Sequence, residues 1–298
     1  MKIFVLGEKE RALRELCAGA RTFGNVELIA LKDEQVIEGV ADVVRRIPVP
    51  ANVMVEDAVD TIEALVKREA PDAIFVQPSI SMKLLVGRLA ARLSTSAVSS
   101  IVTVSAEGAS SMFFGGLAHS SVKVQGPVAI YYIGPGIFGD AVASGTNAVV
   151  DEGFVSCKQQ VEILACSKID KSGVDLTSAK RVVGVGRGIA AEEDLGMIRE
   201  LASAIGAEVG CTRPVTEMDH WMPRETYIGV SGLVIKPDIY ISIGISGQSQ
   251  HIVGVDTSKT IIVVNKDPNC PMFEYADYGI VGDLYNIVPK MIEVAKKI

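Results

Sequence analysis

The chain has 298 residues, of which 48% are hydrophobic, and it carries a formal net charge of −7 with a pI near 5.2. This length suits two domains, each with its own core. The acidic balance excludes nucleic acid as a partner, because no surplus of Lys and Arg is left to neutralise phosphates. Five cysteines without any C-x-x-C pair are typical of free thiols in a reducing compartment, which predicts a cytoplasmic protein.

The first half of the chain alternates short apolar runs with amphipathic helices, which we expect at 8–22, 55–69 and 82–93. This alternation predicts a mostly parallel sheet. After Ser99 the pattern changes to strand-like runs separated by Gly and Pro, and we expect these to extend or flank the sheet. The start, MKIFVLGEKER, lacks the basic residues and the longer apolar run of a secretory signal. The apolar run 126–138 is too short and too interrupted to span a bilayer, so we expect no direct membrane insertion.

Residues 158–180, rich in Ser, Lys and Asp, are expected to form a linker or domain boundary. From Arg181 the alternation resumes, with helices expected at 192–205 and 284–296. We therefore predict an α/β fold of two domains. An N-terminal, mostly parallel α/β sheet domain would cover residues 1–165, and a C-terminal Rossmann-like domain would cover residues 178–298.

The stretch 240–265 carries the strongest functional signal. One apolar run ends at Ser246-Gly247 and a second ends at Asn265. Polar residues at the carboxyl ends of parallel strands are how such a sheet presents a ligand crevice. We expect Ser246 and Gly247 to open a helix whose N–H groups and dipole suit a phosphate, with His251 as a further donor. The pattern predicts a nucleotide cofactor with a redox-active ring.

An ordered set of residues continues from this stretch: Tyr240, Gly244-Ile245-Ser246-Gly247, Gln250-His251, Gly254, Asn265-Lys266-Asp267, Pro271-Met272-Phe273, Ala276-Asp277-Tyr278-Gly279 and Asp283. This set resembles the signature of the alpha subunit of electron transfer flavoprotein, a family that carries FAD in its C-terminal domain. The match covers at least residues 181–289, and the N-terminal half is compatible but less distinctive. The resemblance therefore implies that the predicted C-terminal domain binds FAD.

Two arginines gain a role from this resemblance. Gly184-Val185-Gly186-Arg187-Gly188 is no dinucleotide fingerprint, because the third glycine of G-x-G-x-x-G would fall at Ile189, and alone it reads as a tight strand–helix turn. The family's matching arginine contacts the FAD diphosphate, a role that a guanidinium performs well. Thr212-Arg213 reads alone as a surface turn, but the resemblance implies a nucleotide contact for Thr212 and a cation over the flavin for Arg213. Such a cation would stabilise the negatively charged reduced ring.

The remaining predicted contacts follow from the same resemblance. Ser231 matches a hydroxyl near the flavin N5, whereas Val230 stands where many members have Gln, which leaves the flavin potential open. His251, which alone reads as a structural residue, would donate to the pyrimidine carbonyl. The resemblance implies that Asn265 and Asp283 grip the ribose-phosphate and adenine portions, whereas Asp283 alone reads equally well as the N-cap of the final helix. The full predicted set is Arg187, Thr212, Arg213, Ile228, Gly229, Val230, Ser231, Ser246, Gly247, Gln248, Ser249, Gln250, His251, Asn265, Asp283 and Leu284.

The sequence offers no convincing catalytic residues. We find no nucleophile–base pair and no His/Cys cluster at metal-ligand spacing, and we take His119, His220 and Trp221 as structural or surface residues. This absence favours an electron carrier over a stand-alone enzyme.

The resemblance also implies partners. A separate beta subunit would complete a heterodimer, electrons would come from an acyl-CoA dehydrogenase-type flavoenzyme of fatty acid beta-oxidation, and a flavoprotein-quinone oxidoreductase at a membrane would accept them. We expect residues 111–116 and 128–134 to supply exposed apolar surface for the partner. Two alternatives stay open: a nicotinamide-nucleotide-binding oxidoreductase subunit of similar fold, and a cofactor-free scaffold subunit.

Overall fold

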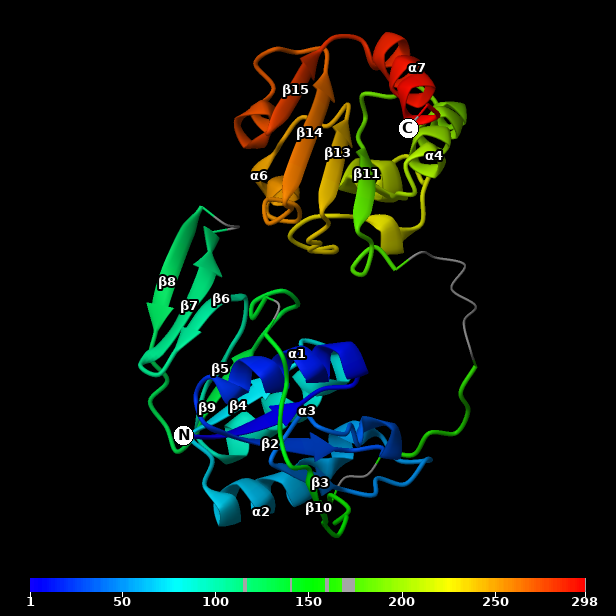
Figure 1. The fold of residues 1–298 in the computed structure, drawn as a ribbon. Helices are drawn as coiled ribbons and strands as arrows, with labels where there is room; N and C mark the ends of the chain where they lie inside the picture. The colour runs from blue at the N-terminus through cyan, green and yellow to red at the C-terminus, as the bar shows by residue number, and fades with distance from the viewer. Residues whose placement is uncertain (115–116, 140, 159–160, 168–174, 298) are drawn as a thin grey trace. The chain divides into compact units, whose positions relative to one another are not determined.

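The computed structural model describes residues 1–114, 117–139, 141–158, 161–167 and 175–297 (Figure 1). The chain divides into two compact units, Met1–Phe113 with Ala118–Lys168, and Ile169–Ile298 with Phe114–Leu117. Each unit contains its own parallel sheet, which confirms the predicted α/β class. The domain limits at residues 165 and 178 stay predictions, and part of the expected linker lies outside the described residues.

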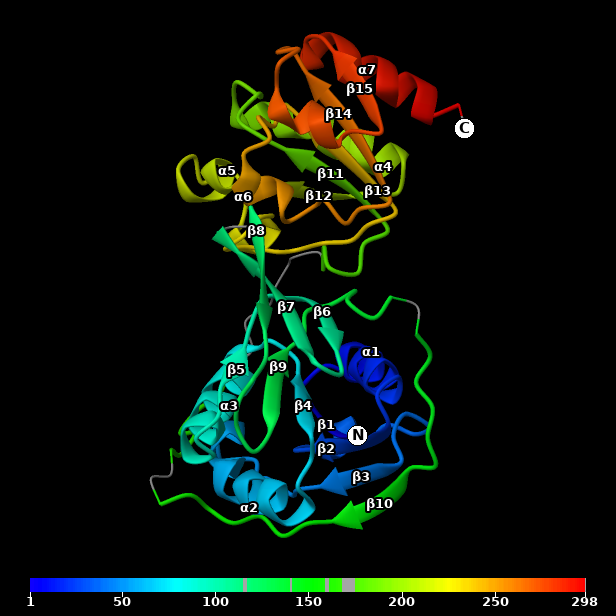
Figure 2. The same cartoon turned by 90° about the vertical axis from the view of Figure 1, so that its left-hand side faces the viewer.

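The first unit is built on a seven-stranded parallel sheet in the order β10-β3-β2-β1-β4-β9-β5. Successive side chains of each strand point to opposite faces, so apolar residues such as Phe4 and Val5 in β1 serve two separate cores. One core packs against α2 and α3 and the other against α1, as Figure 2 shows. The elements of this sheet and its helices are β1 (Lys2–Leu6), α1 (Glu10–Arg21), β2 (Asn25–Ala30), η1 (Asp33–Gln35), β3 (Val43–Arg46), η2 (Val55–Ala58), α2 (Val59–Glu69), β4 (Ala73–Val76), α3 (Ile80–Arg92), β5 (Ala97–Val98), β9 (Ala129–Tyr132) and β10 (Ala148–Asp151).

The three helices predicted for this unit are present. The predicted helix 55–69 begins with a 3-10 turn, η2, before α2 continues it. The helix α3 starts at Ile80, ahead of the predicted residue 82, because the side chain of Ser79 accepts a hydrogen bond from the N–H of Met82 and so caps its first turn.

The strands after Ser99 follow two different courses. β6 (Ile101–Ser105), β7 (Gly108–Phe113) and β8 (Ala118–Val122) form a separate antiparallel sheet, whereas β9 enters the main sheet between β4 and β5. The expectation of exposed apolar surface therefore holds for one segment and fails for the other. Phe113 and Phe114 are 54% and 73% exposed, but Ile130 is fully buried because β9 is an interior strand.

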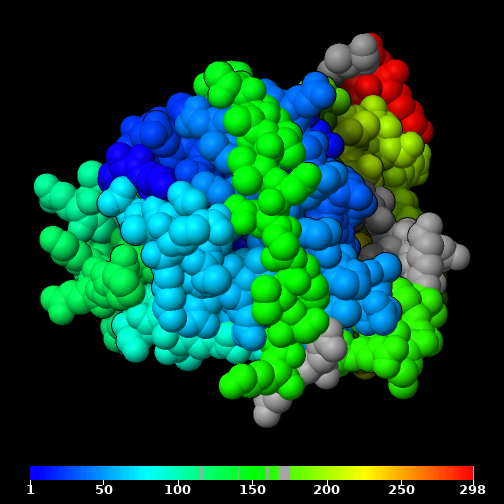
Figure 3. Space-filling view, turned by 90° about the horizontal axis from the view of Figure 1, so that it is seen from below, coloured from blue at the N-terminus to red at the C-terminus, as the bar shows by residue number. Residues whose placement is uncertain are grey.

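A long segment returns across the first unit to complete its sheet. In Figure 3 the green part of the chain lies across the blue and cyan surface. Its strand β10 pairs in parallel with β3, with Ala148 beside Val43. The buried guanidinium of Arg45 supports this edge, because it contacts the carboxylates of Glu27 at 2.5 Å, Glu152 at 2.6 Å and Glu69 at 3.1 Å. A buried cation with three carboxylate partners holds the returning segment in one register.

The second unit has a five-stranded parallel sheet in the order β12-β11-β13-β14-β15. One face packs against α4 and α7, and the other surrounds the fully buried Tyr240. The predicted helix 192–205 opens with the 3-10 turn η4, and the predicted helix 284–296 is α7. The elements are β11 (Arg181–Val185), η4 (Glu192–Asp194), α4 (Leu195–Ala204), β12 (Glu208–Cys211), α5 (Arg213–Glu217), η5 (Arg224–Thr226), β13 (Ile239–Ile243), α6 (Ser249–Ile252), β14 (Thr260–Asn265), η6 (Pro271–Tyr275), β15 (Tyr278–Val281) and α7 (Leu284–Ala295).

In the described part of the chain, no helix has the length and apolar character needed to cross a membrane.

Candidate functional site

A pocket of about 830 Å³ opens where the strands of the second unit end. The loops that follow β11, β12 and β13 form its walls, together with the last residue of β14. This is the edge at which an open parallel sheet is expected to bind a ligand, and the volume suits a large cofactor. The lining residues are Gly186, Arg187, Gly188, Thr212, Arg213, Pro214, Tyr227, Val230, Ser231, Gly244, Ile245, Ser246, Gln248, Gln250, His251 and Asn265.

Most of the residues predicted to bind the cofactor meet in this pocket. The predicted residues that line it are Arg187, Thr212, Arg213, Val230, Ser231, Ser246, Gln248, Gln250, His251 and Asn265. Ile228, Gly229, Gly247 and Ser249 belong to the same loops but are not among the lining residues. Asp283 and Leu284 lie at the start of α7, outside the lining, where Asp283 caps the helix by accepting from the N–H of Tyr285 at 3.0 Å and Leu284 is buried in the core. The geometry therefore supports the N-cap interpretation of Asp283.

Three glycines bring the loops after β11 and β13 into backbone contact. A Cβ atom at Gly186 would lie 2.5 Å from the carbonyl oxygen of Gly244, and one at Gly188 would lie 2.5 Å from its Cα. Gly244 itself has a φ of 62°, in the left-handed region. Only glycine allows this approach, so the floor of the pocket is made of bare backbone.

The loop Ser246–Gln248 does not open a helix, and that expectation is wrong. Gly247 has a φ of 79°, which turns the chain before α6 begins at Ser249. A helix as short as α6 also cannot supply the dipole that the sequence argument invoked. The loop instead offers free hydrogen-bond donors. The N–H groups of Ser246 and Gly247 donate no hydrogen bond to any residue that the structure describes. Unpaired N–H groups beside a pocket suit an anionic ligand.

Two guanidinium groups border the same pocket. Arg187 is exposed, and its Nε lies 3.6 Å from Oδ2 of Asp219, an ion pair too long for a hydrogen bond. That Asp219 oxygen is buried and finds no hydrogen-bond partner among the described residues. Arg213 is the first residue of α5, and its side chain forms no ion pair within the described part of the chain. Both cations are therefore available to a phosphorylated ligand.

Two hydroxyl groups, those of Tyr227 and Ser231, belong to residues that also line the pocket. The hydroxyl of Ser231 lies 3.3 Å from that of Tyr227, and the N–H of Val230 donates to the carbonyl of Gln250 at 2.8 Å. These contacts tie the loop that carries Ser231 to the start of α6. Tyr227 escaped the sequence reasoning, because no motif or spacing marked it.

The buried ring of His251 lines the pocket and forms two contacts within the chain. Its Nδ1 lies 3.1 Å from the carbonyl of Ile228, which can only accept, so Nδ1 carries the proton. Its Nε2 lies 2.8 Å from the hydroxyl of the buried Tyr240 and accepts from it. Burial lowers the pKa of His251 to about 4, which keeps the ring neutral at physiological pH. In this arrangement both ring nitrogens have partners within the chain, so His251 supports the pocket wall, and its predicted bond to a flavin carbonyl stays a prediction.

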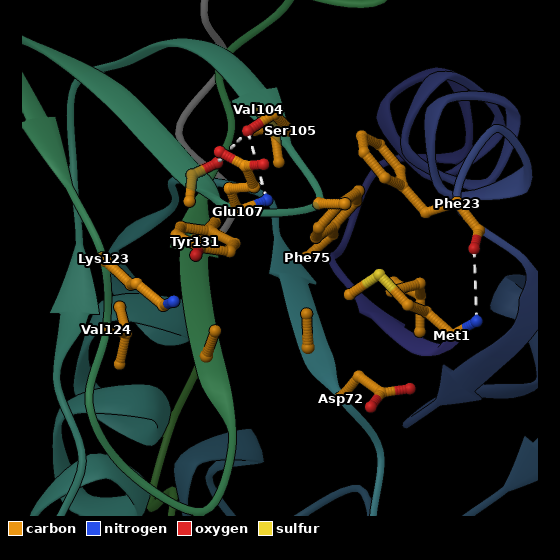
Figure 4. A pocket seen from close by; sticks show the side chains of 15 residues that line it. Met1, Phe23, Asp72, Phe75, Val104, Ser105, Glu107, Lys123, Val124 and Tyr131 are labelled. Atoms are coloured by element: carbon orange, nitrogen blue, oxygen red, sulfur yellow. Dashed lines mark hydrogen bonds between the residues drawn. The ribbon is translucent and has the colours of Figure 1, made fainter.

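A second cavity, in the first unit, is a weaker candidate. It measures about 190 Å³ and lies among Phe23, Phe75, Tyr131 and the turn at Glu107 (Figure 4). Its volume is well below that of the larger pocket, and its three aromatic rings share the wall with charged side chains such as Asp72 and Lys123. The described residues also contain no group of three or more His, Cys, Asp or Glu side chains suited to a metal ion.

Comparison with known proteins matches two family models to the chain. The model described as "Electron transfer flavoprotein domain" matches residues 13–152, and that described as "Electron transfer flavoprotein FAD-binding domain" matches residues 175–256. "Protein FixB" of Escherichia coli O139:H28 is 35% identical over an alignment of 305 positions, which covers 98% of this chain and 97% of that protein. The protein named "Putative electron transfer flavoprotein subunit YdiR" of Escherichia coli K12 is 42% identical over 243 residues, covering 80% of this chain and 78% of that protein.

A solved structure, the glycotransferase of kitacinnamycin, aligns with 99% of this chain and 94% of its own at 10% identity, with a TM-score of 0.28. No argument about fold or function rests on a score this low.

Proposed function

Because the chain belongs to the electron transfer flavoprotein family as an alpha-type subunit, with FAD as its cofactor, we propose that it carries electrons as one half of a heterodimer. A separate beta subunit is its partner. The donor is a flavoenzyme of the acyl-CoA dehydrogenase type that serves fatty acid beta-oxidation, and the acceptor is a flavoprotein-quinone oxidoreductase at a membrane. The subunit has no stand-alone turnover and works in the cytoplasm.

The observation that carries this proposal is the 830 Å³ pocket with two guanidinium groups at its border and, in the loop beside it, two N–H groups without a described partner. FAD combines a diphosphate with a large ring system, and this pocket offers cations, backbone donors and room for both. Among the lining residues that the structure describes, no nucleophile is activated by a base, which is in keeping with a pocket that holds a cofactor. When bound, FAD supplies the ring that takes up and releases electrons.

Each of the chain's own groups has a defined task in this proposal. Arg187 and the N–H groups of Ser246 and Gly247 bind the diphosphate. Arg213 places a fixed positive charge near the ring and so favours its reduced, more negative state. The hydroxyl of Ser231 offers a hydrogen bond to the ring, and neutral His251 holds the Ile228 carbonyl so that this loop keeps its position.

Exposed apolar side chains support the existence of a partner. Phe113, Phe114 and Leu117 are 54%, 73% and 77% exposed near the ends of β7 and β8. Large apolar side chains concentrated at an exposed tip are typical of surfaces that a partner covers.

The test is co-expression of the chain with a candidate beta subunit, followed by extraction of the cofactor from the purified complex. We expect co-purification, a single FAD per chain, and bleaching of the flavin absorbance when an acyl-CoA dehydrogenase and its substrate are added. A complex that prefers FMN, or a chain that is fully loaded with FAD as a lone monomer, would contradict the proposal. Turnover of NADH without bound flavin would instead support a nicotinamide-dependent subunit.

A further inference from the structure

Cys270, which follows β14, contacts the loop that borders the FAD pocket. Its thiol is buried, with 4% of the residue exposed. The Sγ atom lies 3.2 Å from the carbonyl oxygens of Ile245 and Ser246, and 3.2 Å from Nδ2 of Asn265. Burial raises the pKa of this thiol, so it keeps its hydrogen and can donate it.

The thiol of Cys270 has a single hydrogen, and the other hydrogen bonds of the loop decide which carbonyl accepts it. The carbonyl of Ile245 already accepts from Nδ2 of Asn265 at 2.9 Å. The carbonyl of Ser246 receives no hydrogen bond from any other residue that the structure describes. The thiol therefore donates to Ser246, while its sulfur accepts the second Nδ2 hydrogen of Asn265.

Peptide geometry links these inward contacts to the pocket. All peptide bonds described in the chain are trans, so each N–H points opposite to the carbonyl of the residue before it. The carbonyls of Ile245 and Ser246 point toward Cys270, and the N–H groups of Ser246 and Gly247 consequently point away from it. These are the two N–H groups without a partner among the described residues.

We propose that Cys270 is a positioning residue for FAD, whose thiol fixes the Ser246–Gly247 peptide so that its N–H group faces the diphosphate. The proposal rests on the placement of the diphosphate at this loop, given above. Loss of the thiol hydrogen leaves the Ser246 carbonyl without a described partner at a part-buried position, and the peptide then gains by rotating its carbonyl toward water in the pocket. That rotation would turn an acceptor toward the diphosphate in place of a donor.

The test compares FAD affinity among variants of the full chain in complex with its partner, measured by the quenching of flavin fluorescence as FAD is added back. Cys270→Ala should weaken FAD binding about tenfold to a hundredfold, the effect of losing a hydrogen bond to a charged ligand. Cys270→Ser keeps a donor at the same position and should stay within about twofold of the wild type. Cys211→Ala is the matched control, because this second buried thiol bonds to Thr226 and does not touch the loop.

Two results would overturn the proposal: Cys270→Ala binding FAD as tightly as the wild type, or Cys270→Ser binding as weakly as Cys270→Ala. If Cys270→Ala does not fold, Cys270→Ser decides alone, with wild-type affinity in support and weaker affinity against. Arg187→Ala separates this inference from its premise. If Arg187→Ala weakens binding while Cys270→Ala does not, only the positioning role fails, and if neither weakens binding the diphosphate placement fails as well.

Discussion

The two units share one architecture and treat the ends of their strands in opposite ways. In the first unit, the loop after β1 is closed by the side chain of Gln77, whose Oε1 accepts from the N–H groups of Glu8 at 2.7 Å and Lys9 at 3.0 Å. In the second unit, the loop after β13 keeps the N–H groups of Ser246 and Gly247 free of any described partner. The comparison indicates that the carboxyl edge of a parallel sheet determines where a ligand can bind, whereas free N–H groups in the loops determine whether one binds there.

The largest expected effect comes from filling the tight turn of the second unit. In Gly247→Ala, the new Cβ would lie 2.2 Å from the backbone nitrogen of Met272 at a φ of 79°. We expect a loss of about 3 kcal/mol from the unfolding free energy of this unit, together with loss of FAD. Urea unfolding followed by the fluorescence of Trp221, the only tryptophan, measures the effect in this unit alone.

Gly39→Ala in the first unit is the matched control for that substitution. Gly39 has a φ of 69°, but nothing lies within 4 Å of its added Cβ, so only backbone strain of about 1 kcal/mol is expected. Circular dichroism measures the loss in Gly39→Ala, because Trp221 reports only the second unit. Equal losses in the two variants would mean that the contact with Met272 does not matter.

Acid should destabilise the second unit before the first. The pKa of His251 is about 4 in the folded chain and near 6.5 when unfolded, so between these values the unfolded state binds more protons. Neutral His251 contributes fully to the unfolding free energy above pH 6.5, and this contribution is lost as the pH falls toward 4. The loss amounts to about 2 kcal/mol by pH 5. Unfolding followed by Trp221 fluorescence from pH 7 to 5 measures the slope, and His251→Gln should flatten it. An unchanged slope in that variant would assign the acid sensitivity elsewhere.

Removal of Arg213, the cation proposed to lie near the ring, should alter the flavin and leave the fold intact. Arg213→Ala is expected to make the one-electron reduction of the flavin less favourable by about 1.5 kcal/mol, since a preorganised charge is lost. The midpoint potential should fall accordingly. Arg224→Ala is the control, because Arg224 is exposed, pairs with Glu217 and does not line the FAD pocket. Stepwise reductive titration of both variants gives the potentials, and a shift of the same size in Arg224→Ala would point to a general effect of net charge.

The smallest expected effect tests the closed end of the first unit. Gln77→Ala removes two hydrogen bonds at a half-buried site, where water can replace the amide, so we expect a loss of about 1 kcal/mol. The loss should be visible by circular dichroism and absent from the Trp221 signal. FAD content should not change, and a variant that loses FAD would contradict the assignment of the site to the second unit alone.

The sequence predicted the sheet class and the pocket edge because both follow from local patterns. Apolar runs that end in Ser246 or Asn265 mark buried strands and their polar ends. The shape of the Ser246 loop did not follow, since helix-compatible residues say nothing of the contact between Gly247 and Met272 that forces a left-handed φ. The protonation state of His251 was not predicted either, because it depends on a hydrogen bond between α6 and the hydroxyl of Tyr240 in β13. Residues 128–134 were expected on the surface because only long-range pairing places β9 inside the sheet.

The returning strand β10 has a consequence for how the chain is made. Its partner β3 precedes it by about a hundred residues, and the ion pair between Arg46 and Asp151 spans 105 positions. During synthesis, β1, β2 and β4 can pair as soon as they leave the ribosome, but the edge at β3 stays open until the later segment emerges. The first unit therefore passes through a stage with an exposed strand edge, when a second nascent chain could pair with it. The exposed stage ends when Glu152 reaches the buried Arg45 and completes its ion-pair cluster. This cluster favours the chain's own strand over a foreign one.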